Sequence, residues 1–72
     1  MNATTVDARG LSCPEPALMT RQALLTAGEG AVVVLVDAAT ARDNVARTAE
    51  LAGWQAVVET QIDGSYRLML TK

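Results

Sequence analysis

Ala31-Val-Val-Val-Leu-Val36 is the longest purely apolar run in this chain of 72 residues. The run is short, continuous and rich in β-branched side chains, which is typical of a central strand covered along much of both sides. It falls far short of the roughly 20 apolar residues that span a bilayer. The sequence therefore predicts a buried strand inside a small globular domain, and no membrane segment.

Helical and extended patterns alternate on either side of this run. Thr4–Ala8 alternates apolar with polar side chains, which predicts a first strand. Ala17–Ala27 is rich in helix formers and stops at Gly28, and Thr40–Ala52 carries one apolar stripe at helical spacing and ends before Gly53. We expect the buried face of the first helix to consist of four apolar residues, Ala17, Leu18, Leu24 and Leu25.

The remainder of the chain has the pattern of a β-hairpin. Trp54–Glu59 and Tyr66–Thr71 both alternate in hydropathy, and Asp63-Gly64 between them favours a turn. The element order is then β-α-β-α-β-β, and right-handed crossovers put both helices on the same side of the sheet. The sequence predicts an α/β fold of the two-layer α+β kind, with two helices on one face of a mixed four-stranded sheet. The opposite face should contact water through Thr5, Asp7, Arg67 and Thr71.

Length, composition and charge exclude several classes of protein. The chain suffices for one domain, taken as residues 1–72, and with 50% hydrophobic residues it is too apolar to be disordered. The net charge is −2 and the basic residues stand singly, whereas nucleic-acid binding depends on clustered Lys and Arg. The first residues lack the pattern of a secretory signal, so we expect a cytoplasmic protein without direct nucleic-acid or membrane contacts.

The chain has no histidine and one cysteine, which excludes most catalytic templates. A histidine base for serine or cysteine, an internal disulfide and a usual zinc site are all ruled out, so we expect no metal. The remaining reactive group is Cys13, in Leu11-Ser12-Cys13-Pro14-Glu15-Pro16. Cys13 is the candidate catalytic residue.

The prolines beside Cys13 have local consequences. A residue before proline is held out of the α region and proline is tolerated at the first helical position, so Cys13 should be extended at a helix start. The helix dipole favours the thiolate and Glu15 opposes it, which leaves the pKa of Cys13 open. A lone cysteine is often a small buried hydrophobe, but a helix start flanked by prolines is not a usual core position, which favours a functional thiol.

Three other residues are candidate partner contacts: Arg9, Arg21 and Met19. Each has a plain alternative, because isolated arginines are more often solvated surface and a methionine at a helix edge also serves to fill gaps.

The stretch Val6-Asp-Ala-Arg-Gly-Leu-Ser-Cys-Pro-Glu-Pro-Ala-Leu18 resembles the defining motif of the TusA/SirA/YedF family of small sulfur-carrier proteins. That motif is Cys-Pro-X-Pro preceded by Asp-X-Arg/Lys-Gly-Leu, and the resemblance extends over the whole chain. The YedF-like branch looks closest, through segments at Val34–Asp37, Asn44-Val45, Gly53-Trp54 and Gly64–Leu68.

The resemblance implies a sulfurtransferase that accepts a persulfide sulfur on Cys13 from a cysteine desulfurase or a rhodanese-like donor. The sulfur would then pass to a downstream acceptor protein, with no cofactor beyond the transient persulfide. It also implies that Pro14, Glu15 and Pro16 complete the motif and set the helix start. Asp7, Arg9 and the motif-supporting Gly10 match the approach to it.

Two departures from the family pattern leave the downstream partner open. Met19 stands where the family often has Lys or Arg, and Asp43-Asn44-Val45 differs from the Asp-Ile-Pro of tRNA-thiolating members. Family members also serve cofactor synthesis or sulfur oxidation, and the YedF branch is linked to selenium metabolism. Two alternatives therefore remain, a regulatory or adaptor module that docks through the helix tip and a selenium-handling protein.

Overall fold

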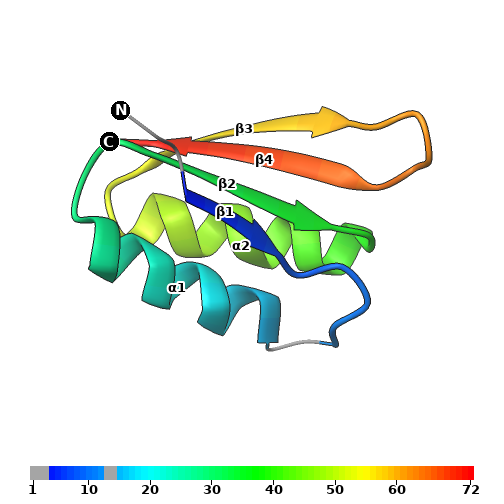
Figure 1. The fold of residues 1–72 in the computed structure, drawn as a ribbon, viewed down its shortest axis with the longest axis horizontal. Coiled ribbons are helices and arrows are strands. Elements are labelled where there is room, and N and C mark those ends of the chain that lie inside the picture. The colour runs from blue at the N-terminus through cyan, green and yellow to red at the C-terminus, as the bar shows by residue number, and fades with distance from the viewer. Residues whose placement is uncertain (1–3, 13–14) are drawn as a thin grey trace.

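The computed structural model describes residues 4–12 and 15–72, so Cys13 and Pro14 lie outside the described residues. The elements are β1 (Thr4–Asp7), α1 (Glu15–Ala27), β2 (Ala31–Val36), α2 (Ala39–Leu51), β3 (Gln55–Thr60) and β4 (Tyr66–Thr71). Both helices cover the same face of one sheet (Figure 1). The predicted order and two-layer arrangement are confirmed. Neither helix in this part of the chain is long and apolar enough to cross a membrane.

The sheet has the strand order β1-β2-β4-β3, with β2 and β4 at its centre. β1 pairs with β2 in parallel, and β4 runs antiparallel to both of its neighbours. The parallel pair requires a crossover, which α1 provides, whereas the antiparallel pair of β3 and β4 needs only a hairpin. Because β1 and β2 are parallel, their carboxyl ends meet at one edge of the sheet.

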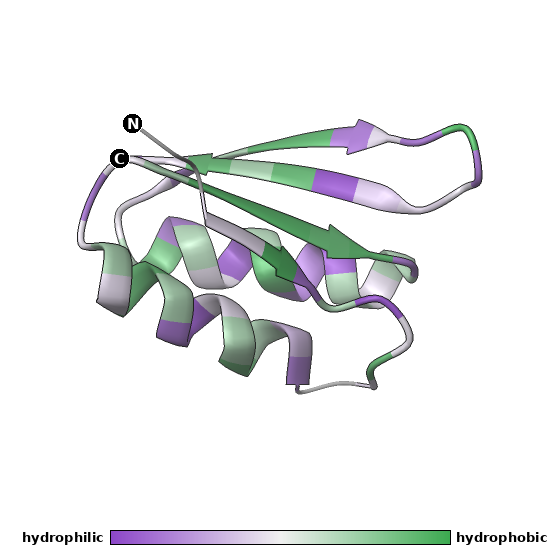
Figure 2. Cartoon of the chain, in the orientation of Figure 1, coloured by the Kyte–Doolittle hydropathy of each residue, from purple (hydrophilic) through white to green (hydrophobic). Residues whose placement is uncertain are grey.

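The core lies between the helices and the inner face of the sheet. Val32, Val34 and Val36 alternate along β2 and are fully buried, and β4 adds Leu68 and Leu70 beside them. Figure 2 shows the corresponding continuous apolar band along β2. The helices and the residue before β3 complete the cluster with Leu24, Ala41, Val45, Ala49 and Trp54. Aliphatic side chains therefore form the core almost alone.

The buried face of α1 differs from the predicted one. Pro16, Thr20 and Leu24 are buried at intervals of four residues, whereas Leu18 and Leu25 are 58% and 70% exposed. Hydropathy does not reveal this face because it contains a threonine. The Thr20 hydroxyl donates a hydrogen bond to the carbonyl oxygen of Pro16 at 2.8 Å, so the polar group is satisfied inside the core.

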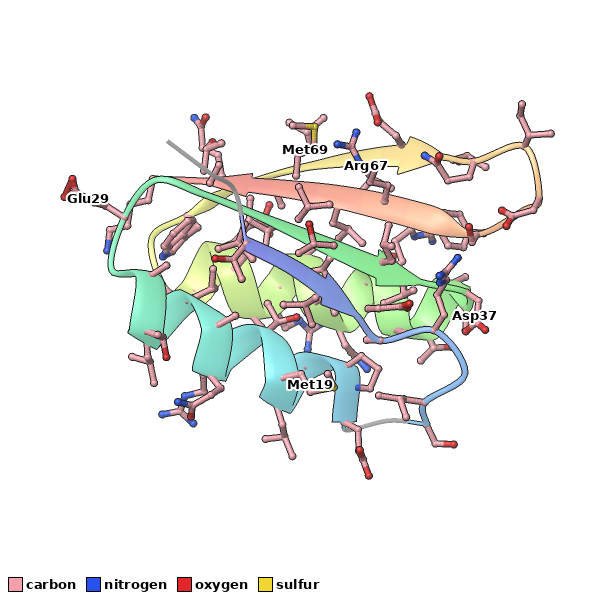
Figure 3. The ribbon with its side chains drawn as sticks, in the orientation of Figure 1. Met19, Glu29, Asp37, Arg67 and Met69 are labelled. Atoms are coloured by element: carbon pink, nitrogen blue, oxygen red, sulfur yellow. The ribbon has the colours of Figure 1, made fainter. Side chains whose placement is uncertain are left out.

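The outer face of the sheet is less polar than predicted. Thr5, Asp7 and Thr71 are exposed as expected, and Arg67 is half-buried with its Nη1 3.0 Å from Glu59 Oε1. The strand registers also place aliphatic side chains on this face, namely Val33, Leu35, Val57 and Met69. Val33 is only 7% exposed because neighbouring side chains cover it. Figure 3 shows Met69 and Arg67 projecting from this side.

The hairpin turn occurs where the sequence predicts it, but the loop between β3 and β4 is longer than a two-residue turn. The Gln61 N–H donates to the Ser65 carbonyl oxygen at 2.7 Å. Gly64 has φ +88°, a left-handed conformation that favours glycine. Asp63 Oδ1 accepts hydrogen bonds from the N–H and the hydroxyl of Ser65.

We expect Leu68→Ala to lower the free energy of unfolding by about 2–5 kcal/mol, because it removes a fully buried side chain of β4. The matched control is Leu51→Ala, at a leucine that is 82% exposed, which should change stability by less than about 0.5 kcal/mol. Urea denaturation of both variants measures the difference. If both variants lost the same free energy of unfolding, the assignment of Leu68 to the core would be wrong.

Candidate functional site

The loop at residues 8–12 joins β1 to α1 and leads directly to Cys13. Ala8 is buried, and its N–H donates to the Leu35 carbonyl oxygen at 2.8 Å, which extends the pairing of β1 with β2 by one residue. The Leu11 N–H then approaches the Ala8 carbonyl oxygen at 3.4 Å as the chain turns away from the sheet. The loop therefore starts from a buried, hydrogen-bonded position.

Gly10 occupies the middle of this loop in a conformation that explains why the sequence has glycine there. Its φ is +80°, in the left-handed region that side chains with a Cβ rarely adopt. Its N–H donates to Asp37 Oδ2 at 2.9 Å. Asp37 was not singled out as a site residue. Its position immediately after β2, at the edge where the parallel strands β1 and β2 end, is the pattern that could have identified it.

Arg9 is fixed against the last residue of β1. Its Nε and Nη2 donate to the two carboxylate oxygens of Asp7, each at 2.9 Å, and its backbone N–H approaches Oδ1 at 3.2 Å. The Arg9 side-chain hydrogen bonds lower the pKa of Asp7 to about 2. The same pair, with the charges of Asp63 and Asp37 nearby, raises the pKa of Arg9. Asp7 therefore holds the Arg9 guanidinium in place. Contact of Arg9 with a partner protein stays a prediction.

The residues that flank Cys13 and Pro14 show how the helix begins. The Glu15 N–H donates to the Ser12 carbonyl oxygen at 2.9 Å, and α1 begins at Glu15. Ser12 and Glu15 are exposed, whereas Pro16 is fully buried. The predicted role of Glu15 and Pro16 at the helix start is consistent with this geometry. The predictions for Cys13 and Pro14 themselves fall outside the described residues.

Met19 and Arg21 face different surfaces of α1. Met19, with Val6 and Leu18, lines a shallow apolar groove beside β1. Arg21 lines a groove of about 600 Å³ between the two helices, whose floor includes Leu24 and Trp54. The structure does not bring the two residues to one groove, so a partner contact at Met19 and one at Arg21 would use different surfaces of α1.

The carboxylates near the loop already have partners. Asp7 binds Arg9, Asp37 accepts from Gly10, and Asp63 accepts from Ser65, which lowers the pKa of Asp63. Among residues 4–12 and 15–72, no three His, Cys, Asp or Glu side chains are grouped so as to hold a metal ion. The arrangement provides an anchored loop rather than a cluster of acid–base groups.

The fold and the site define a class of protein. It is a two-layer α+β domain whose single cysteine follows an anchored loop in the sequence and precedes a helix. The family model described as sulfurtransferase TusA matches residues 4–72. The chain is also similar to the crystal structure of a SirA-like protein from Desulfitobacterium hafniense, with a TM-score of 0.88 and 34% sequence identity over 94% of this chain and 95% of that one. The chain belongs to the TusA sulfurtransferase family.

We expect Asp7 to titrate at about 2 in the folded protein, against an ordinary value of 3.8, and to return toward 3.8 in Arg9→Gln. Because folding lowers this pKa, the stabilisation from the pair is complete above the ordinary value and is lost as the pH falls toward 2. Carboxyl carbon chemical shifts measured against pH test this. Arg67→Gln breaks a different ion pair and should leave Asp7 unchanged. An Asp7 pKa that stays at about 2 in Arg9→Gln would contradict the assignment.

Proposed function

We propose that this protein is a cytoplasmic sulfur carrier that receives a persulfide sulfur on Cys13 and delivers it to an acceptor protein. The observation that carries the proposal is the family match over residues 4–72, which includes the only cysteine in the sequence. That cysteine lies between the exposed residues Ser12 and Glu15. A thiol in this role must be reached by sulfur atoms on two other proteins.

The proposed loading step requires no group other than the thiolate. The sulfur of Cys13 attacks the outer sulfur of a persulfide on the donor enzyme, a new S–S bond forms, and the S–S bond of the donor breaks. The donor thiolate leaves with the bonding electron pair, and Cys13 carries the persulfide. In the delivery step the thiolate of the acceptor attacks the outer sulfur in the same manner, and Cys13 returns to a thiolate. No external oxidant or reductant is consumed.

Exposed apolar side chains near position 13 support protein partners rather than a small-molecule substrate. Leu11 is 36% exposed, and Leu18 and Met19 are exposed on the first turns of α1. Large apolar side chains at the surface are suited to the centre of a protein interface. A cysteine desulfurase or a rhodanese-like protein is the proposed donor.

The proposal also covers the branch of the family to which the chain belongs and the element, sulfur or selenium, that it transfers. The sequence segments that look YedF-like favour a place in that branch, where selenium is an alternative cargo. A docking module with an incidental cysteine is the other alternative. The docking module predicts that a desulfurase adds no sulfur at Cys13, whereas the selenium-handling protein differs from a sulfur carrier in the element that Cys13 binds.

We expect incubation with a cysteine desulfurase and cysteine to add one sulfur atom to the intact protein, at Cys13 only. The reason is that Cys13 is the only thiol in the sequence. Intact-mass spectrometry measures the addition, and a thiol reductant should reverse it. Cys13→Ser is the control and should gain no mass.

A wild-type protein that stays unmodified by several donors, each active toward another acceptor, would overturn the carrier function. A second measurement loads the protein in the presence of both sulfur and selenium donors. Elemental analysis of the loaded protein then shows which of the two elements is bound, and so separates a sulfur carrier from a selenium carrier.

A further inference from the structure

Asp37 connects the end of β2 to the loop that carries Cys13. Its Oδ2 accepts a hydrogen bond from the Gly10 N–H at 2.9 Å, across 27 residues of sequence. Figure 3 places Asp37 at the end of the sheet beside the loop between β1 and α1. Gly10 precedes Cys13 by three positions. The bond therefore joins the residue that follows the central strand β2 to the loop that leads to the thiol.

Without this hydrogen bond, the loop would be weakly restrained at Gly10. Glycine has more backbone freedom than any other residue, and an added Cβ here would meet no atom within 4 Å, so packing does not hold this position. A hydrogen bond from an amide to a carboxylate is charge-assisted, and it is shorter and stronger than one between neutral groups. Asp37 thus supplies the restraint that packing does not.

The start of α2 shows that the Asp37 carboxylate is not used as a helix cap. α2 begins at Ala39, and its N-cap residue Ala38 makes no side-chain capping hydrogen bond. No acidic residue lies in the first turn of this helix either. The Asp37 carboxylate, two positions before the helix, instead accepts a hydrogen bond from Gly10. The carboxylate therefore does not act as a capping acceptor of α2, although its negative charge near the helix start also complements the helix dipole.

Besides the local bonds of Arg9 to Asp7 and of Leu11 to Ala8, three hydrogen bonds restrain the loop along the chain toward the thiol. The Ala8 N–H binds the Leu35 carbonyl oxygen, the Gly10 N–H binds Asp37, and the Ser12 carbonyl oxygen accepts from the Glu15 N–H. The first and third restraints are backbone bonds that belong to the sheet and the helix. The middle restraint is a side chain, so a single substitution can remove it and leave the other two.

We propose that Asp37 is a positioning residue for Cys13, acting through the Gly10 N–H; this role rests on the proposed function. Transfer between two proteins requires both sulfur atoms to meet in line, and a fixed loop lowers the entropy lost in that encounter. A small alkylating reagent also reacts in line, but it reorients freely around the thiol and therefore does not need the loop to be fixed. Loss of the anchor should therefore slow exchange with protein partners and leave alkylation unchanged.

The experiment compares Asp37→Ala, which removes the acceptor, with Asp37→Asn, which keeps a carbonyl oxygen at the same place. We expect the kcat/KM for loading by a cysteine desulfurase to fall about tenfold in Asp37→Ala, less than the roughly hundredfold cost of a misplacement of about 1 Å. Asp37→Asn should stay within about twofold of the wild type, because an amide oxygen also accepts from Gly10. Iodoacetamide should alkylate Cys13 at one rate in all three proteins.

Amide hydrogen exchange checks the contact independently of activity. Exchange at Gly10 should become faster in Asp37→Ala and stay slow in Asp37→Asn. Glu50→Ala is the matched control, since it removes an exposed carboxylate in the last turn of α2, and it should alter neither exchange nor loading. Circular dichroism verifies the fold. If Asp37→Ala unfolds, Asp37→Gln replaces it, because its longer side chain moves the acceptor away from Gly10.

The outcomes separate this role from the proposed function. If the wild type takes up no sulfur, the carrier function is overturned and the positioning role with it. If the wild type loads and Asp37→Ala loads equally fast, only the role of Asp37 is overturned. If Asp37→Asn is as slow as Asp37→Ala, negative charge rather than the hydrogen bond is responsible, which also contradicts the proposal.

Discussion

The burial of Val32, Val34 and Val36 against two helices is the interaction on which the rest of the structure depends. These side chains contribute most of the inner face of β2, the strand that pairs with both β1 and β4. A shift of one residue in either pairing would turn them toward solvent, so their burial specifies the register of the sheet. With no disulfide and few aromatic side chains available, this aliphatic packing is the main source of stability.

The geometry of the candidate site follows from that register. Because Asp7 pairs with Leu35, the chain leaves β1 beside the end of β2, and Asp37 comes within hydrogen-bonding distance of Gly10. The loop between β3 and β4 ends at the same side of the sheet (Figure 1), which brings the charge of Asp63 toward Arg9. The core therefore determines where the loop toward Cys13 leaves the sheet, and Ala8 belongs to both the core and the loop.

Much of this arrangement could be predicted from the sequence. The order of elements, the two layers and the family are confirmed, because periodicity, glycine punctuation and the motif around Cys13 all act over short stretches of chain. The buried face of α1 could not be predicted in this way. Thr20 is buried because its hydroxyl binds a carbonyl one turn earlier, whereas Leu18 and Leu25 remain exposed at the edges of the helix. Hydropathy alone predicts the opposite, namely that the two leucines are buried and the threonine is exposed.

Asp37 was missed as a site residue for a different reason. Its partner is 27 residues away, and only the parallel pairing of β1 with β2 brings the two together. An acidic residue after a buried strand has many ordinary explanations, such as capping the next helix. Strand pairing must be known before the contact with Gly10 can be inferred.

The central claim is that Cys13 is a relay, which both gains and loses a sulfur atom. The most direct test is a single-turnover transfer in which Cys13 is loaded with ³⁵S, separated from the donor and mixed with an acceptor protein of the sulfur relay. The account predicts that label leaves Cys13 and appears on the acceptor thiol, and that Cys13 can then be loaded again. Label that stays on Cys13, or that is released only as free sulfide, would contradict it.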